Sequence, residues 1–222
     1  LGMQNNPSFI ADPDHKRKVF TWLLEASWDA KGNLMVFQYK REDNVNIPSS
    51  CYEQSRTERK HFTNTYLKKV LYGNKKMYRP DTDFSEYDFH FQLVLDYGGI
   101  VLRNEELRIG QEGWKCRNDA FSSYKSGFEI RTYRLCERLL MFHHFEELGA
   151  EPVLVRSTDL EYKHSETGSF SLLSGVTHKG YKDDIEDSFP PLTLTYSQAV
   201  PADHFKTVTS RELQQLPAGI DG

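Results

Sequence analysis

Two histidines beside two glutamates form the most promising group of chemically active side chains in this sequence. His143 and His144 precede Glu146 and Glu147, and imidazoles with carboxylates are common zinc ligands. Adjacent residues of a strand point to opposite faces of a sheet, so these two imidazoles are badly placed to share one ion. The His-Glu-x-x-His spacing of zinc proteases is also absent. We therefore interpret the pair as sheet or rim residues and predict no metal site.

Two groups of acidic residues are the next candidates, because calcium binds clustered carboxylate oxygens. One group consists of Asp81, Asp83, Glu86 and Asp88, and the other is the run 183–187. Neither has the spacing of an EF-hand loop, with its central glycine and terminal glutamate. We interpret both groups as solvated loops.

Nucleophilic catalysis finds little support in the sequence. No Gly-x-Ser-x-Gly elbow is present, and Ser174 before Gly175 on a predicted strand is a weak signal. Gly98 and Gly99 follow a predicted strand but lack the later glycines and lysine of a phosphate-binding loop. We predict no catalytic, cofactor-binding or metal-binding residue, and we expect the chain not to be an enzyme.

The three cysteines are too few and too widely spaced for a disulfide framework or a metal site. They have neither CxxC spacing nor an even number, and we expect reduced thiols with no structural role. These residues are Cys51, Cys116 and Cys136.

Three arginines alternate with bulky side chains in one short segment. Arg131, Arg134 and Arg138 lie near Tyr133 and Leu135, and basic residues mixed with aromatics are typical of nucleic-acid surfaces. Two glutamates in the same segment dilute this charge. The simpler interpretation is that the arginines pair with carboxylates on neighbouring strands or face a protein partner.

The overall charge argues against two classes of partner. The 222 residues carry a formal net charge of -4, so no global positive field attracts nucleic acid or anionic membranes. No apolar run approaches the roughly 18 to 20 residues that span a bilayer. We therefore expect no nucleic-acid partner and no direct membrane insertion.

The elements that would position these side chains are predicted to be strands. Aromatic residues make up 13% of the chain and apolar residues only 38%, a bias that favours pleated, half-buried surfaces. Residues 19–28 and 34–41 predict a hairpin, because the link between them contains Gly32 and Asn33, which tolerate positive φ. Residues 153–162 and 169–178 predict a second hairpin.

Residues 87–97 alternate so regularly that they predict a strand buried on one side. His90 would then be a solvated strand residue, opposite the side that carries Phe89 and Phe91. Residues 127–145 fit both a helical and a strand pattern, and we favour one long, bent strand. The remaining expectations are strands at 65–72 and 192–196, a long loop at 42–64 and irregular structure at 100–127.

About eight strands separated by turns indicate an all-β, mainly antiparallel fold with long loops and little helix. We expect a flexible N-terminal segment at 1–16, a single β-rich domain at 17–205 and a C-terminal linker to a following domain at 206–222.

Several stretches together resemble one protein family. Residues 121–145 resemble the signature stretch of the middle, TcdB-type region of insecticidal toxin-complex (Tc) B components and of the related SpvB-type virulence proteins. Residues 66–74 and 91–98 resemble the strands that precede it. Residues 153–162, 174–181 and 190–196 continue in the same order, so that the similarity extends over about 17–222.

Two details qualify the resemblance. Residues 28–34, followed by Tyr39, are similar to the Tyr-Asp repeat hairpin of RHS proteins. Residues 113–121 depart from the family, which tends to have a proline-containing Arg-Pro-Asp-x-Phe there, and this departure puts the local turn in doubt.

The resemblance implies a structural role without catalysis. In Tc toxins, B and C components form a hollow shell around a toxic region of C, and a propeller of B docks on the pore-forming A component. The implied partners are other domains of the same B protein and the A and C components. The implied location is secreted, as part of a toxin complex, after a period in the bacterial cytoplasm. The ADP-ribosyltransferase region of some SpvB-type proteins has no counterpart in this sequence.

Two other function classes stay open at the level of sequence. One is an independent β-sandwich binding module that recognises a carbohydrate or a host surface protein, which would need a concave row of aromatic side chains with convergent polar groups. The other is a hydrolase, for which the sequence offers no nucleophile–base pair.

Overall fold

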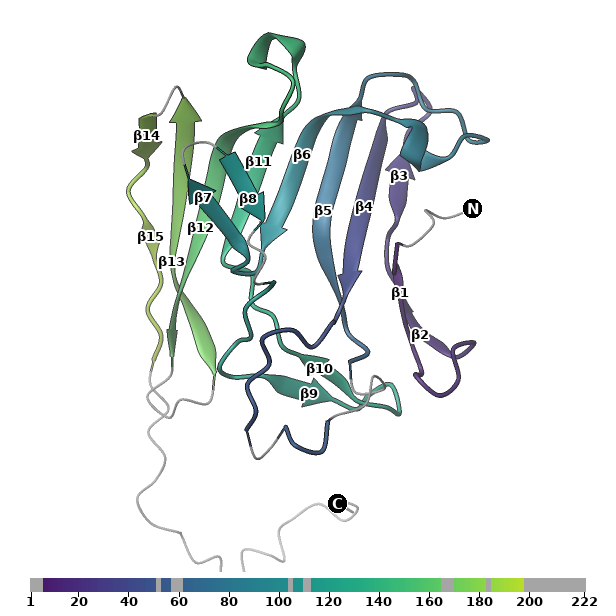
Figure 1. Ribbon diagram of the computed structural model, residues 1–222, viewed down its shortest axis with the longest axis vertical. Helices are drawn as coiled ribbons and strands as arrows, with labels where there is room; N and C mark the ends of the chain where they lie inside the picture. Colours follow the sequence, from purple (N-terminus) through teal and green to yellow (C-terminus); the bar gives the residue numbers. More distant parts are fainter. Residues whose placement is uncertain are drawn as a thin grey trace, which may run out of the picture.

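One large antiparallel sheet dominates the computed structural model, which describes residues 6–50, 53–56, 62–103, 106–109, 113–164, 170–182 and 185–197 (Figure 1). The sheet has nine strands in the order β14-β13-β12-β11-β6-β5-β4-β3, and β15 pairs with β13 beside β14. The strands are β3 (Ala26–Trp28), β4 (Leu34–Arg41), β5 (Thr65–Asn74), β6 (Phe89–Asp96), β11 (Arg138–His143), β12 (Val153–His164), β13 (Ser171–Lys182), β14 (Ile185–Ser188) and β15 (Leu192–Thr193).

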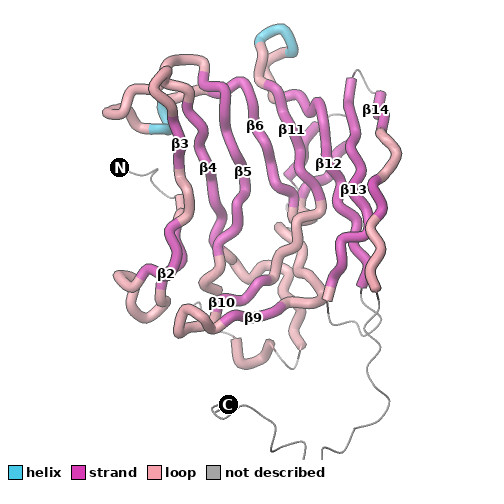
Figure 2. The backbone as a smooth tube through the Cα atoms, turned by 180° about the vertical axis from the view of Figure 1, so that it is seen from behind, coloured by secondary structure: helices cyan, strands magenta, loops and turns pink. Residues whose placement is uncertain are grey.

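Three two-stranded sheets accompany the large sheet. They are β1 (Phe9–Ala11) with β2 (Val19–Trp22), β7 (Ile100–Arg103) with β8 (Glu106–Ile109), and β9 (Phe121–Ser123) with β10 (Ile130–Thr132). The strands β9 and β10 lie at one end of the large sheet, and the pair β7–β8 lies in front of β11 and β12 (Figures 1 and 2).

Helix is confined, in the described residues, to the one-turn 3-10 helices η2 (Phe84–Glu86) and η3 (Glu146–Leu148). No helix in the described part of the chain is long and apolar enough to cross a bilayer. The all-β, mainly antiparallel prediction is confirmed.

Two apolar clusters cover one face of the large sheet. Leu34 and Val36 of β4 pack under Tyr78, from the segment that links β5 to β6. Farther along the sheet, Leu140 and Phe142 of β11 are fully buried with Ile100, the first residue of β7. The β7–β8 hairpin therefore covers the middle of this face.

A third cluster lies on the opposite face. Leu95 follows Val94 in β6 and so points the other way, where it packs against Tyr66, Tyr97 and Trp114. Val94 is nonetheless buried too. The prediction that residues 87–97 form a strand buried on one side only is wrong, because separate segments of the chain cover both faces.

Two predicted strands are divided in the structure. Residues 19–28 form β2 and β3, which belong to different sheets, and residues 127–145 form β10 and β11, separated by 133–137. In the second case the chain leaves the sheet because Tyr133 and Arg134 are buried elsewhere. Local periodicity does not reveal such a change of sheet.

Two stretches predicted to lack strands contain them. Residues 100–127 include β7, β8 and β9, and β14 lies within the run 183–187 and its neighbour Ser188. These strands are only three or four residues long, too short for an alternating pattern to stand out. Residues 42–64 contain no strand in their described part, as predicted.

The first predicted hairpin is confirmed and shows why its turn sequence matters. Trp28 of β3 pairs with Leu34 of β4, and Gly32 has a φ of +77°. The Asp29 carboxylate accepts hydrogen bonds from the backbone N–H groups of Lys31 and Asn33, each at 2.9 Å. A short acidic side chain that satisfies turn N–H groups stabilises such a reversal.

The β12–β13 hairpin is also confirmed, with a register from Arg156↔Gly180 to His164↔Ser171. Its predicted turn residues lie outside the described part of the chain. At the N-terminus, β1 falls within residues 1–16, and residues 9–11 of that segment pair with β2. The predicted linker 206–222 also lies outside the described residues.

Candidate functional site: an arginine–carboxylate network

The segment from β10 to β11 carries the most concentrated chemistry of the described structure. Its three arginines each meet a carboxylate from a distant part of the sequence: Arg131 with Glu53, Arg134 with Glu42, and Arg138 with Asp96. We call these six residues the arginine network. The prediction of carboxylate pairing is confirmed, although only Asp96 lies on a neighbouring strand.

Arg134 is the most deeply buried member. Its side chain and that of Glu42 are both 0% exposed. Nε donates to Glu42 Oε2 at 2.9 Å and Nη2 donates to Glu42 Oε1, while Nη1 donates to the Trp114 carbonyl at 2.7 Å and Nη2 to the Val45 carbonyl at 2.8 Å. Burial lowers the pKa of Arg134, but the bonds and charges of Glu42 and Asp43 outweigh it, and the pKa is raised.

Glu53 joins the network to a second ion pair. Arg131 Nε donates to Glu53 Oε1 at 3.0 Å, and the Tyr133 hydroxyl donates to Glu53 Oε2 at 2.7 Å. Arg56 Nη1 lies 3.6 Å from the same Oε2 atom and binds Glu129 as well. Burial, followed by the bond and charge of Glu53, raises the pKa of the Tyr133 hydroxyl. The hydroxyl therefore stays a neutral donor.

Glu129 accepts hydrogen bonds from three different side chains. Arg56 Nη2 donates at 2.9 Å, Ser122 Oγ at 2.6 Å and the Tyr124 hydroxyl at 3.0 Å. Burial raises the pKa of Glu129, but these donors outweigh burial and lower it to about 2. Glu129 is therefore charged over the whole physiological range.

Asp96 organises the turn after β6 as well as binding an arginine. Its Oδ1 accepts the backbone N–H groups of Gly98, Gly99 and Ile100 at 2.9, 3.1 and 3.2 Å. Its Oδ2 accepts Arg138 Nε at 2.8 Å. The carboxylate is 0% exposed, so both oxygens replace water by protein donors.

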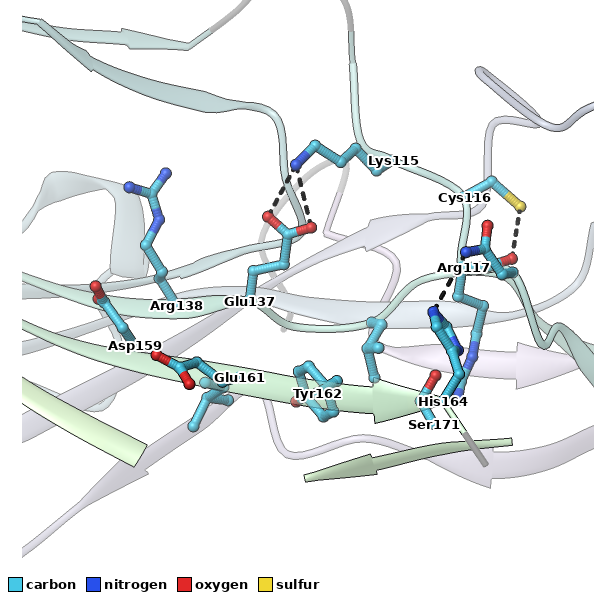
Figure 3. A pocket seen from close by; sticks show the side chains of 13 residues that line it. Lys115, Cys116, Arg117, Glu137, Arg138, Asp159, Glu161, Tyr162, His164 and Ser171 are labelled. Atoms are coloured by element: carbon cyan, nitrogen blue, oxygen red, sulfur yellow. Dashed lines mark hydrogen bonds and ion pairs between the residues drawn. The ribbon is translucent and has the colours of Figure 1, made fainter. Parts of the chain in front are cut away.

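A groove of ≈ 570 Å³ lies where the segment 115–118 runs beside β12 (Figure 3). Several charges along it are paired: Lys115 Nζ donates to the two Glu137 carboxylate oxygens at 3.2 and 3.1 Å, and Arg138 binds Asp96. The Tyr162 hydroxyl donates to the Cys136 carbonyl at 2.8 Å. The groove thus contains paired charges rather than a nucleophile with a base.

Of the other predicted candidates, Gly98 and Gly99 donate their backbone N–H groups to Asp96 of this network, and Cys136 Sγ donates to the Arg138 carbonyl at 3.4 Å. Ser174 is buried, with its Oγ 3.3 Å from the Glu161 carbonyl. Cys116 and Cys136 are free thiols, and burial raises the pKa of Cys136 to about 11. Cys51 lies outside the described residues.

The acidic groups are surface features where the structure describes them. Asp81, Asp83, Glu86 and Asp88 are all exposed, and Asp83 caps η2 through a 2.8 Å bond from Ser85 N. In the second group, residues 183 and 184 lie outside the described part. Within the described residues, no three histidine, cysteine or acidic side chains gather as a metal site would require.

The prediction that His90 is a solvated strand residue is wrong. Its ring is half-buried and stacks on Phe145 at a centroid distance of 4.7 Å, so it is not a solvated strand histidine. His143 ends β11 and His144 follows it, at the rim of the sheet as expected.

Sequence reasoning missed Glu42 and Glu53, which are buried although they belong to the long loop 42–64. That loop contains four acidic and three basic residues, so its charge pattern gave no signal that these two carboxylates would be buried.

Solved structures show what class of protein this architecture defines. The chain superposes on the complex described as TcdB2-TccC3-Cdc42 with a TM-score of 0.74 and 31% identity, over 89% of this chain and 10% of that one. It superposes on the Photorhabdus luminescens Tc holotoxin pore with a TM-score of 0.73 and 31% identity, over 86% and 9%. The fold is that of a Tc B-type domain.

The family follows from sequence comparison. Residues 1–145 match the model described as Salmonella virulence plasmid 65kDa B protein, SpvB. This chain belongs to the SpvB family, which confirms the resemblance.

Individual relatives agree with the family match. The mono(ADP-ribosyl)transferase SpvB of Salmonella typhimurium is 35% identical over 160 residues, 69% of this chain and 27% of that protein. The N-terminal domain of the effector SpvB from Salmonella typhimurium strain LT2 superposes with a TM-score of 0.70 and 31% identity, over 79% of this chain and 55% of that one. The chain thus spans about a quarter of the length of the curated relatives.

Proposed function

We propose that this chain is a non-catalytic structural domain of a Tc-toxin B-type protein, contributing to the scaffold that encloses and delivers a toxic effector. Its partners would be other domains of the same B protein and the A and C components. The proposed domain is 17–205, followed by a linker at 206–222. We further propose that the protein is made in the bacterial cytoplasm and secreted as part of the complex.

A stripe of exposed apolar side chains is the observation that carries this proposal. Phe20, Trp22, Leu24 and Trp28 alternate along the chain at one edge of the large sheet and are 49%, 75%, 56% and 52% exposed. Strands normally turn such residues toward the core. Exposed apolar side chains gathered near a sheet edge are typical of a surface that another protein segment covers.

The opposite edge of the sheet has the same character. Ile185 of β14, Phe189 and Leu192 of β15 are 67%, 75% and 65% exposed. Edge strands also present unpaired backbone groups, which isolated proteins usually protect with charge or cover. Apolar side chains at both edges fit a segment that continues into neighbouring protein on either side.

Tryptophan accessibility tests this proposal directly. The chain has three tryptophans, and Trp114 is only 9% exposed, so it serves as an internal control. Oxidative footprinting would be read by mass spectrometry on the chain alone and with purified Tc A and C components added. We expect Trp22 and Trp28 to be oxidised in the isolated chain and protected in the complex, with Trp114 slow in both.

Self-association gives a second readout, because exposed apolar edges pair when their partner is missing. We expect light scattering to detect dimers or larger species of the isolated chain, and Trp22→Ser with Trp28→Ser to reduce them. A strictly monomeric chain whose tryptophans stay reactive with every component present would contradict the scaffold role. Protection by an added glycan would favour a carbohydrate-binding module.

A further inference from the structure

A cluster of histidines and aromatic rings joins the end of β11 to the beginning of β6. His90 stacks on Phe145 with an interplanar angle of 18°, and Phe145 also contacts Phe91 and His143 edge-on at 5.7 and 5.6 Å. The His144 N–H donates to the His90 carbonyl at 2.9 Å. These five residues, His90, Phe91, His143, His144 and Phe145, are the histidine–aromatic cluster.

Two ring nitrogens of the cluster are buried without a hydrogen-bond partner in the described structure. They are His90 Nδ1 and His144 Nε2. A neutral imidazole has one N–H donor, whereas a protonated imidazole has two, and each of them requires a hydrogen-bond acceptor. A buried donor without an acceptor is costly. An N–H at His144 Nε2 would therefore be buried without an acceptor.

The charges around His144 act in the same direction. Lys69 of β5, Lys75, which follows β5, and the neighbouring His143 each act on it electrostatically. Burial first, then Lys69, Lys75 and His143, lower the pKa of His144. No described ion pair joins His144 to a carboxylate, and the acidic residues next to the cluster in sequence, which are Glu146 and Glu147 after Phe145 and Asp88 before Phe89, are exposed.

We propose that the histidine–aromatic cluster is a pH-sensitive latch, which holds the ends of β6 and β11 together while the His144 imidazole is neutral and opens when that ring is protonated. A His144 ring charged in the folded chain would be repelled by Lys69 and Lys75 and would hold a buried N–H without an acceptor. Local opening solvates that ring and separates the positive charges. Opening of the latch would loosen the turn between β11 and β12, which contains η3, while the rest of the sheet stays paired.

The direction with pH follows from the lowered pKa. The unfolded or opened chain binds a proton at the ordinary histidine pKa of about 6.5, while the closed cluster binds it only at lower pH. The latch is therefore fully stable above about pH 6.5 and weakens as pH falls below that value. Each unit of separation between the two pKa values corresponds to a tenfold change in the opening equilibrium.

Amide hydrogen exchange, corrected for intrinsic rates at each pH, tests the latch in the wild-type chain. We expect protection of the Phe91 and Phe142 amides to fall between pH 7.5 and pH 5.5, by more than twofold and at most about tenfold. Protection of Val36, in β4, is expected to change less than twofold. Histidine NMR on the same samples should show His144 titrating below 6.5.

Three variants decide the outcome. His144→Gln removes the titrating ring, and we expect it to abolish the pH-dependent loss of protection. Lys75→Gln, at an exposed position, should raise the titration midpoint of His144 and reduce that loss. His15→Gln is the control, since His15 is exposed and lies far from the cluster in the sequence, and should behave like the wild type. Constant protection in the wild type, or the same loss in His144→Gln, would overturn the latch.

Discussion

Buried arginines determine how the long loop 42–64 is attached to the rest of the molecule. Arg134 has no exposed side-chain surface and donates to a carboxylate and two carbonyls. Burying an ion pair costs desolvation that its attraction only partly returns. The pair is therefore better understood as fixing one arrangement of the loop than as a large net source of stability.

Breaking that pair should be far more damaging than breaking an exposed one. We expect Arg134→Met to lower the free energy of unfolding by about 3–5 kcal/mol, because Glu42 is left buried and unpaired. Lys115→Met, which breaks the exposed pair with Glu137, should cost less than about 1 kcal/mol. Urea unfolding measures both. Equal losses would show that Glu42 can reach water without Arg134.

Glu129 predicts how the molecule responds to strong acid. Its pKa is lowered from 4.5 to about 2 in the folded chain, so its stabilising contribution is present above about pH 4.5 and is lost as pH falls toward 2. Wild type and Glu129→Gln should differ most in unfolding free energy near neutral pH and converge only as pH falls to about 2. A difference that is independent of pH would mean that Glu129 acts by shape alone.

At the scale of elements, the turn of the β3–β4 hairpin depends on a close approach to another segment. A Cβ at Gly32 would overlap Met77 Cγ and lie 3.0 Å from the Tyr78 backbone nitrogen. Gly32 and Gly127 share a positive φ, but Gly127 has no atom within 4 Å of such a Cβ. The two glycines therefore separate backbone strain from crowding.

Alanine at these glycines should give different losses. We expect Gly127→Ala to cost about 1 kcal/mol, from the left-handed backbone alone. Gly32→Ala adds overlap with the segment after β5 and should cost at least about 1 kcal/mol more. Thermal and urea unfolding of the two variants give the comparison. Equal costs would show that residues 77 and 78 shift without penalty.

At the scale of the whole molecule, the large sheet has a buried centre and apolar edges. Phe142, in the central strand β11, is fully buried, whereas Phe189, beside the edge strands, is 75% exposed. Isolated globular domains rarely expose groups of large apolar side chains such as those around Phe189. Coverage by neighbouring protein is the physical explanation that the proposed scaffold role supplies.

Removing the Phe142 ring should affect stability, whereas removing the Phe189 ring should affect association with partners. Phe142→Ala should destabilise the isolated chain by about 3–5 kcal/mol, because it leaves a cavity in the core. Phe189→Ala should change its stability by less than about 0.5 kcal/mol but weaken association with the A and C components in a pull-down. If Phe189→Ala unfolds the chain or leaves association intact, the outer edge is not an interface.

The sequence by itself determined the all-β class and both long hairpins, because alternation and turn chemistry are local properties of a few adjacent residues. Asp29, Gly32 and Asn33 mark the reversal through local hydrogen bonds and a positive φ, although the segment around Tyr78 packs against it in the fold. The three arginines were also recognisable as candidates for pairing with carboxylates.

Only the tertiary structure decided which carboxylates they meet. Arg138 and Asp96 are 42 residues apart, Arg131 and Glu53 are 78 apart, and Arg134 and Glu42 are 92 apart. The sequence pattern predicts one strand over residues 127–145 and a solvated His90, and both predictions are wrong for the same reason. The burial of each residue is set by segments from elsewhere in the chain that fold over it. Those contacts depend on how the chain closes long loops, and no local pattern encodes that choice.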